Sequence, residues 1–242
     1  MIEELLPAGA ACSEAFHDPE NAELFPEERE LVARAVAKRR AEFTTGRHCA
    51  RRALAALGVA PQPILAGKHR APRWPEGYTG TITHCTGYRA AAVASTAVLD
   101  SIGVDAEPSL PLPAGVLDRI ALPGERAMLA RLTEAHPGVC WDRLLFCGKE
   151  AVYKAWYPLT GRWLGFEEAD ITIDAAPDLG SGRFAARILA RQGVTGSDGL
   201  PVSGFAGRWL ARNGLIVTCV AVGSPGWTCE PTGRNPVRPT VT

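Results

Sequence analysis

Hydrophobic residues near the start of the chain recur at helical spacing. Between residues 31 and 36 they lie at i, i+1, i+4 and i+5, a few positions after Pro26 and two glutamates. Proline in the first turn and carboxylates at the positive end of the helix dipole favour a helix start, so we predict a helix from Pro26 to about Arg40. A second apolar stripe predicts a helix over residues 45–57, ended by Gly58. The arginines of this second stretch lie off its stripe, so we expect them to face solvent or a ligand.

The pattern then changes to that of loops and strands. Residues 58–80 are rich in Pro and Gly and predict a long structured loop. Short runs rich in β-branched residues follow between turn signals and predict three strands. In chain order these runs read TITH, AAAVAST and SIGVDAE.

Helical periodicity returns in the second half of the chain, around residues 110–120, 123–135 and 141–156, where we expect three helices. After them come four more strand-like runs, ITID, RFAARILA, GFAGRWLA and LIVTCVAV. The last three predict an antiparallel meander with turns at Gly193–Gly199 and Asn213–Gly214.

Helices followed by strands occur twice, over residues 26–107 and 110–222. The fold class that we predict is α+β with two similar α/β lobes, although the halves share no letter-by-letter repeat. We expect an N-terminal lobe over residues 1–103 and a C-terminal lobe over residues 104–223. Residues 224–242 combine several prolines with no periodicity, which predicts a disordered tail.

Composition and charge exclude several classes of protein. The chain has 242 residues, of which 46% are hydrophobic, and 26 basic against 26 acidic residues give a formal net charge of zero. It has no run of about 18 apolar residues, and its acidic start lacks the apolar segment of a secretory signal. Its seven cysteines are scattered without paired spacing, which is typical of reduced cytosolic thiols and not of structural zinc. We therefore expect a cytoplasmic monomer with no membrane partner and no nucleic-acid partner.

Two acids close one of the predicted strands. Asp105 and Glu107 flank Ala106, so a strand would put both carboxylates on one face. Two such carboxylates repel one another unless a cation lies between them, and oxygen ligands suit a hard ion such as Mg²⁺. The alternative is two solvated acids on a loop, because Asp-x-Glu is a common pattern.

Two further motifs contain candidate side chains. Glu150 and Lys154 are four positions apart on a predicted helix, so both project from one face. The alternative is a surface salt bridge beside an aromatic core stripe. His84 stands at the end of a predicted strand, where it is either a structural histidine or a donor to a phosphate oxygen.

Taken together, the motifs resemble those of the 4′-phosphopantetheinyl transferase family. The resemblance is to its larger two-lobed class, which includes the surfactin and enterobactin enzymes, and most of all to actinobacterial siderophore-type and lipid-type members. The motifs follow the family's order and span residues 67–156. They are the proline-containing loop Gly67–Pro75, the segment Thr81–Gly87, the G-x-D-x-E motif Gly103–Glu107, and the K-E-A-x-Y-K motif Lys149–Lys154 with Trp156 behind it.

This resemblance implies a fold, a reaction and a set of site residues. The lobes would be related by pseudo-twofold symmetry, with coenzyme A between them. The implied reaction moves the 4′-phosphopantetheine arm of coenzyme A to a serine of apo acyl or peptidyl carrier proteins, with Mg²⁺ as cofactor, and releases adenosine 3′,5′-bisphosphate. The implied metal ligands are Asp105, Glu107 and Glu150, and the implied catalytic residues are Glu150, Lys154 and His84. The implied coenzyme A-binding residues are Arg39, Arg47, Lys68, His69, Thr83, His84, Asp105, Glu150, Lys154 and Trp163.

The resemblance also implies individual roles. Glu150 would take the serine proton directly or through a water, Lys154 would meet the phosphate that leaves, and His84 would hold a pyrophosphate oxygen. Arg39 and Arg47 would clasp the 3′-phosphate of coenzyme A.

Other positions depart from the family pattern or allow two interpretations. Relatives often have a lysine at the position of Ala66, so Lys68, His69 or Arg70 would supply that charge. Trp163 either walls the pantetheine cleft or is a core tryptophan.

Two other functions stay open at this point. One is a Mg²⁺-dependent phosphohydrolase of nucleotides like coenzyme A, with water as the nucleophile. The other is a non-catalytic module in which the basic stretch of residues 29–52 binds a nucleotide, nucleic acid or an acidic partner.

Overall fold

The computed structural model describes residues 1–175, 180–190, 195, 199 and 201–223. Among these residues no helix combines the length and apolar character needed to cross a membrane. The elements of the first half are η1 (Ile2–Leu5), β1 (Ala10–Ala15), α1 (Pro26–Leu31), α2 (Ala37–Ala56), η2 (Lys68–Arg70), β2 (Tyr78–Cys85), β3 (Tyr88–Ser95) and β4 (Leu99–Pro108). Those of the second half are α3 (Val116–Ile120), α4 (Pro123–Ala135), α5 (Trp141–Thr160), η3 (Phe166–Glu168), β5 (Ala169–Ala175), β6 (Ser181–Ile188), β7 (Gly204–Arg212) and β8 (Leu215–Gly223).

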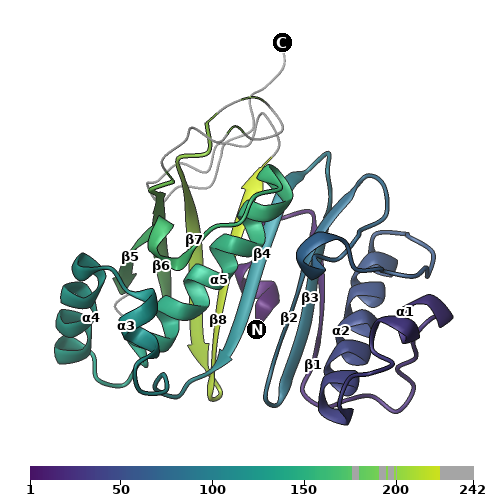
Figure 1. The fold of residues 1–242 in the computed structure, drawn as a ribbon, viewed down its shortest axis with the longest axis horizontal. Coiled ribbons are helices and arrows are strands. Elements are labelled where there is room, and N and C mark those ends of the chain that lie inside the picture. Colours follow the sequence, from purple (N-terminus) through teal and green to yellow (C-terminus); the bar gives the residue numbers. More distant parts are fainter. Residues whose placement is uncertain (176–179, 191–194, 196–198, 200, 224–242) are drawn as a thin grey trace.

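The strands form two antiparallel sheets, each with a 20-residue helix on one face (Figure 1). The smaller sheet has the order β1-β3-β2 and packs against α2, whereas the larger has the order β4-β8-β7-β6-β5 and packs against α5. The predicted α+β class with two α/β lobes describes this arrangement. The boundary that we predicted after Gly103 falls inside β4, the edge strand of the larger sheet.

Small side chains on β3 let the two lobes pack closely. Ala91 and Val93 of β3 face α2, while Ala90, Ala92 and Ala94 face the opposite way and belong to a core shared with β4 and β8. A strand that is buried on both faces between two layers has no room for large side chains on both of them. The alanine-rich run of the sequence is therefore a packing requirement of the junction between the lobes.

Threonine hydroxyls join the two sheets where β2 runs beside β4. Thr81 Oγ1 accepts a hydrogen bond from Val104 N at 3.3 Å, and Thr83 Oγ1 accepts one from Ala106 N at 3.0 Å. Side-chain oxygens thus take the place of backbone carbonyls as the acceptors for this edge of β4. The two sheets stay separate but are tied together at the point where β4 begins its acidic motif.

Gly103 brings α5 against β4. Residues of β4 alternate, so that Ser101 and Asp105 contact α5, with Ser101 Oγ donating to Ala155 O at 2.7 Å. A Cβ atom at Gly103 would lie 2.0 Å from Ala151 O and 2.6 Å from Ala155 N. Only glycine allows this approach, so the first residue of the G-x-D-x-E motif acts through packing.

The helices near the N-terminus differ from the prediction. We predicted one helix from Pro26 to about Arg40 and a second over residues 45–57; α1 ends at Leu31, and α2 runs unbroken over Ala37–Ala56. Only Val32 of the apolar run that suggested the longer first helix is buried, whereas Leu31 is 45% and Val36 72% exposed, so the run does not form a continuous buried face. The chain instead turns between them, which sets α1 beside α2.

Other parts of the prediction were confirmed or need correction. The helices over 123–135 and 141–156 and the strands of the meander are present, and Asn213 and Gly214 have φ values of 54° and 74°, as a two-residue hairpin turn requires. The helix predicted over 110–120 is reduced to α3, because two prolines and a glycine precede it. β1, which pairs with β3, was missed, since its half-buried small and polar residues show no alternation. Most of the turn predicted at Gly193–Gly199 and the whole predicted tail lie outside the described residues.

We expect Gly103→Ala to lower the thermal stability of the protein. The added methyl group collides with the backbone of α5, and overpacking of this kind costs about 1–3 kcal/mol, or about 2–12 °C in Tm for a chain of this size. Gly124→Ala is the matched control, because a Cβ there meets nothing within 4 Å. Differential scanning calorimetry of both variants measures the effect; equal Tm values for Gly103→Ala and the wild type would contradict the packing role.

Candidate functional site

Acidic and basic side chains meet where α5 crosses the end of β4. The strand places Asp105 and Glu107 on the face that contacts α5, as the sequence predicted. Lys154 of α5 donates to Asp105 Oδ1 at 2.7 Å and to Val104 O at 3.1 Å. The i,i+4 salt bridge between Glu150 and Lys154, our alternative for this motif, does not form among the described residues, because Lys154 turns to the strand.

Each of the three carboxylates has a different set of partners. Asp105 Oδ1 also accepts from Thr83 Oγ1 at 3.0 Å, but its Oδ2 is buried without a hydrogen-bond partner. Glu107 Oε2 accepts from Arg143 Nη1 at 2.9 Å. Glu150 forms no hydrogen bond or ion pair with any described residue. The group therefore carries unsatisfied carboxylate oxygens in a partly buried setting.

The electrostatics of the group favour a further cation. Burial, followed by repulsion from Asp105, raises the pKa of Glu150 above its usual value, and the same two causes raise the pKa of Glu107. Burial lowers the pKa of Lys154, but Asp105 outweighs it and the net shift is upward, so the ammonium stays charged. Lys154 and Arg143 supply two positive charges beside three carboxylates, so one negative charge is left without a partner in this group.

The donor set fits a hard divalent ion. No three His, Cys, Asp or Glu side chains within the described part of the chain converge tightly enough to form a finished metal site. Lys154 and Arg143 hold Asp105 and Glu107 instead. The orphaned Asp105 Oδ2 and the unpaired Glu150 are oxygen ligands of the kind that Mg²⁺ takes together with waters and phosphate oxygens. Asp105, Glu107 and Glu150 are the residues that would hold such an ion.

A basic pair lies at the end of β2. His84 Nε2 accepts from Arg39 Nη1 at 2.5 Å, so the ring proton lies on Nδ1, 3.6 Å from Glu42 Oε2. Burial, followed by repulsion from Arg39, lowers the pKa of His84 and keeps the ring neutral, and Lys154 is near enough to contribute. This links the basic pair of the first lobe to the acidic group of the second.

Arg47 is more buried than the sequence suggested. Its side chain is 6% exposed, so of the two alternatives that we predicted for the arginines, solvent or a ligand, solvent is excluded for Arg47. Its Nε donates to Ile64 O at 2.7 Å, and its guanidinium lies 4.3 Å from the centre of the Phe43 ring. Burial lowers its pKa to about 10, which leaves it charged at neutral pH.

A buried glutamate that the sequence analysis missed holds this region together. The Glu28 carboxylate, fully buried, accepts from Arg51 Nη1 and from Ile64 N at 2.9 Å, and lies 4.0 Å from Arg47 Nε. It also caps α1 by accepting from Phe25 N. Through these contacts the carboxylate connects α1, α2 and the long loop. Removal of Glu28 would leave the charge of its buried arginine partner uncompensated.

The loop predicted over residues 58–80 forms a small hairpin. Ala66 and Pro72 are bridged, and Arg73 N donates to Leu65 O at 2.8 Å, so η2 lies at the tip. At that tip His69 and Arg70 have φ values of 53° and 63°, in the left-handed region where non-glycine residues are uncommon. Lys68, His69 and Arg70 are exposed.

The tip of this hairpin reaches the second lobe. His69 lies edge-on to Tyr157 of α5 with ring centres 5.6 Å apart, and Trp163 lies 4.9 Å from Tyr153. Trp163 is 66% exposed, so the alternative of a core tryptophan is wrong. Aromatic rings thus border the acidic group on the side from which the loop arrives.

Lys149, at the start of the K-E-A-x-Y-K motif, is structural in this fold. It is buried, pairs with Glu125 at 2.8 Å, and donates to Phe166 O and Ala169 O. It therefore anchors α5 to α4 and β5, while Glu150 beside it faces the acidic group.

Three functional partners escaped the sequence analysis: Glu28, Glu42 and Arg143. The i,i+3 spacing of Arg39 and Glu42 was a usable signal for Glu42. The glutamates after Pro26 predicted a helix start, which the cap at Phe25 N bears out for Glu28. The contacts of Glu28 with Ile64 and of Arg143 with Glu107 span 36 positions each, so no local pattern pointed to these contacts.

Comparisons with known proteins agree with this geometry. The family model described as the 4′-phosphopantetheinyl transferase N-terminal domain matches residues 27–94, and that of the 4′-phosphopantetheinyl transferase superfamily matches residues 101–192. The chain is 52% identical over 233 residues to 4′-phosphopantetheinyl transferase Svp of Streptomyces mobaraensis, covering 95% of this chain and 92% of that relative.

The chain belongs to the 4′-phosphopantetheinyl transferase superfamily.

Two further relatives extend this result. The chain is 50% identical over 224 residues to 4′-phosphopantetheinyl transferase Npt of Nocardia iowensis, covering 91% of this chain and 99% of that relative. It is 31% identical over 193 residues to enterobactin synthase component D of Salmonella typhi, covering 76% of this chain and 72% of that relative. These similarities confirm the predicted family, fold class and type of enzyme, a transferase of phosphopantetheine. The two family models meet between β3 and β4, and the superfamily model covers the acidic group.

Proposed function

We propose that this transferase moves the 4′-phosphopantetheine arm of coenzyme A to a serine hydroxyl of apo acyl or peptidyl carrier proteins, with Mg²⁺, and releases adenosine 3′,5′-bisphosphate. One observation carries the proposal: an unpaired glutamate and an orphaned aspartate oxygen lie beside one ammonium at the junction of the lobes. This arrangement is suited to a pyrophosphate with a divalent cation. The ion, when bound, would neutralise charge on the pyrophosphate oxygens.

Residues of this chain can accept the proton and meet the leaving group of the transfer step. The serine oxygen bonds to the phosphorus on the pantetheine side, and the bond from that phosphorus to the bridging oxygen breaks. Glu150 takes the serine proton, directly or through a water; its carboxylate has no hydrogen bond or ion pair to a described residue, which leaves it open to a proton. Lys154, held by Asp105, meets the phosphate of the leaving adenosine 3′,5′-bisphosphate.

The first lobe supplies the other anion contacts in this proposal. Arg39 exchanges its bond to His84 for one to the 3′-phosphate, which frees His84 to meet a pyrophosphate oxygen. Arg47 adds a buried charge behind Arg39. Thr83 acts through Asp105, since its hydroxyl donates to that carboxylate.

The hairpin tip and the exposed aromatic rings are suited to contact the pantetheine arm and the carrier protein. Lys68 or His69 supplies the charge that relatives carry at the position of Ala66, and Trp163 walls the pantetheine arm. Arg70 and Arg73 are exposed without an ion pair to any described residue, and suit an acidic carrier protein. We further propose that the enzyme acts as a monomer in the cytoplasm; the free thiols of the described cysteines favour a reducing compartment.

The test of the reaction is intact-mass analysis of an apo carrier protein after incubation with coenzyme A, Mg²⁺ and this protein. We expect the carrier to gain one phosphopantetheine group. Consumption of coenzyme A without any gain of mass on the carrier would identify a phosphohydrolase instead.

In this assay we expect Asp105→Asn to lower the transfer rate by about 100-fold or more, because it removes a metal ligand and the charged partner of Lys154.

The metal assignment has a separate readout. Mg²⁺ should raise the Tm of the wild type, because it relieves repulsion among three carboxylates, and should leave the Tm of Asp105→Asn unchanged. The matched control is Asp118→Asn, which removes an exposed acid paired with Arg126. An Mg²⁺-dependent Tm shift of wild-type size in Asp105→Asn would remove Asp105 from the metal site.

Arg39→Ala should weaken the binding of coenzyme A more than the binding of dephospho-coenzyme A. Loss of a charge-assisted bond is worth about 1.5 kcal/mol at a partly exposed site, so we expect the KM for coenzyme A to rise about tenfold and that for dephospho-coenzyme A to change little. Arg52→Ala, an exposed arginine on the same helix, is the control. Equal KM increases for both ligands would show that Arg39 does not contact the 3′-phosphate.

Arg70→Glu combined with Arg73→Glu should raise the KM for the carrier protein several-fold at low salt and leave the KM for coenzyme A nearly unchanged. The defect should shrink at high salt, because exposed charges are screened beyond about 8 Å at physiological ionic strength. Arg119→Glu with Arg131→Glu, two exposed arginines on α3 and α4, provides the control. A carrier KM equal to that of the wild type at low salt would exclude the hairpin from the docking surface.

A further inference from the structure

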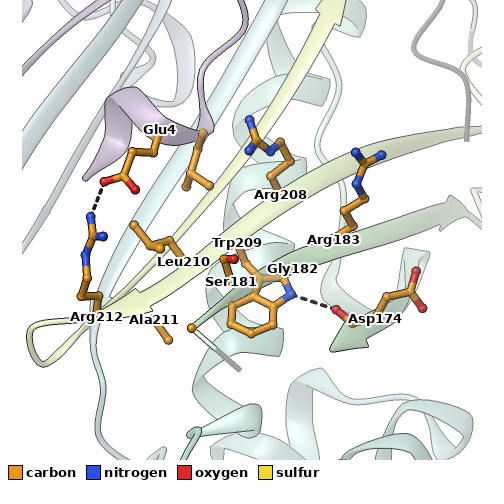
Figure 2. Close-up of a pocket in the computed structure, with 12 residues that line it drawn as sticks. Glu4, Asp174, Ser181, Gly182, Arg183, Arg208, Trp209, Leu210, Ala211 and Arg212 are labelled. Carbon is orange, nitrogen blue, oxygen red and sulfur yellow. Dashed lines mark hydrogen bonds and ion pairs between the residues drawn. The ribbon is translucent and has the colours of Figure 1, made fainter. Parts of the chain in front are cut away.

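A hollow of about 530 Å³ opens on the larger sheet, on the face that points away from α5 (Figure 2). Side chains alternate along β6 and β7, so that Phe184 and Trp209 pack into the core beneath α5 while Arg183 and Arg208 point outward. η1 borders the hollow through Glu4 and Leu5. Glu150 lies on α5, so this hollow and the transfer site are on opposite faces of the sheet.

Two arginines face each other in the hollow, and neither is paired with an acidic residue of the described part of the chain. Arg183 and Arg208 are direct neighbours in the β6–β7 register, and Figure 2 shows both side chains projecting to the same side. Neither forms an ion pair or a hydrogen bond with any described residue. The other two arginines of these strands are both paired, Arg187 with Asp170 and Arg212 with Glu4.

The two guanidinium groups carry like charges on neighbouring strands. Like charges directly opposite each other on a sheet repel. Asp174 lies opposite Arg183 in the β5–β6 register, yet its carboxylate forms no ion pair with that arginine. An anion placed between the two guanidinium groups would remove the repulsion, and their planar donor forks match the oxygens of a phosphate.

We propose that this hollow binds a small phosphate-bearing anion between Arg183 and Arg208. Its volume is within the range of small-molecule sites. The site is separate from the transfer reaction, and its existence does not depend on the proposed function.

The experiment is isothermal titration of the full chain with inorganic pyrophosphate at low ionic strength. We expect Arg183→Ala combined with Arg208→Ala to raise the Kd about tenfold or more, and Arg187→Ala, the paired arginine on the same strand and face, to leave it within about twofold of the wild type. Asp174→Asn should lower the Kd, because it removes a competing carboxylate. The same titrations in protein that also carries Arg39→Ala separate this hollow from anion binding in the transfer site.

A parallel titration with ADP identifies the source of the phosphate. If ADP binds more tightly than pyrophosphate, with the same dependence on Arg183 and Arg208, the ligand of the hollow is a nucleotide. Equal binding of the two indicates that the hollow recognises only the phosphate groups. Unchanged pyrophosphate binding in the double variant, or an equal loss in Arg187→Ala, would overturn the proposal.

Thermal stability provides an independent readout. Without ligand, Arg208→Ala should melt at or above the Tm of the wild type, because it removes a like-charge contact. In protein that also carries Arg39→Ala, pyrophosphate should raise the Tm when Arg183 and Arg208 are present but not when both are replaced by alanine. With Arg39 in place, the double variant should keep the transfer activity of the wild type. A larger loss of ligand-free Tm in Arg208→Ala than in Arg187→Ala would make the arginines structural and also overturn the proposal.

Discussion

Asp105 Oδ1 accepts hydrogen bonds from Lys154 of α5 and from Thr83 of β2, and so connects the long helix of the second lobe with the sheet of the first. Thr83 in turn accepts from Ala106 N on the edge of β4. Because one carboxylate is shared by three elements, the position of the acidic group depends on how the two lobes pack. Burial and Arg39 lower the pKa of His84, and Lys154, held by this contact, is near enough to that ring to add to the shift.

The contact has a steric requirement that other residues meet. α5 can lie against β4 only because Gly103 has no side chain, and β3 can lie between α2 and the larger sheet because its side chains are small. These residues do no chemistry, but they bring the backbone of α5 close enough for Lys154 to reach Asp105. Packing and chemistry are therefore encoded in the same short motif, with glycine for the approach and two acids for the charge.

Charge is divided between the lobes. The first lobe contributes the cations Arg39 and Arg47, with Arg47 held by the buried Glu28, and the neutral ring of His84. The second contributes three carboxylates, with Lys154 beside Asp105 and Arg143 beside Glu107. A ligand rich in phosphate bound between them would contact the cations of one lobe directly and the carboxylates of the other through a metal ion. This division explains why a chain with zero net charge can present a strongly polarised junction.

The sequence by itself determined the elements and the motifs that depend on neighbours along the chain. The period of two placed Asp105 and Glu107 on one strand face, the helical period placed Glu150 and Lys154 on one helix face, and Asn213–Gly214 predicted its turn. The ordered motifs also identified the family. Local patterns suffice for these features because their contacts are one to four residues apart.

Only the tertiary structure decided which side chains meet. It paired Lys154 with Asp105 across 49 positions instead of with Glu150 four positions away, and it buried Arg47 against Glu28. It also divided the predicted first helix, because only Val32 of the apolar run is buried and a longer helix would leave Leu31 and Val36 in solvent. Partners of this kind are chosen by the approach of whole elements, which depends on burial and on the satisfaction of distant charges, and such contacts leave no periodic signal in the chain.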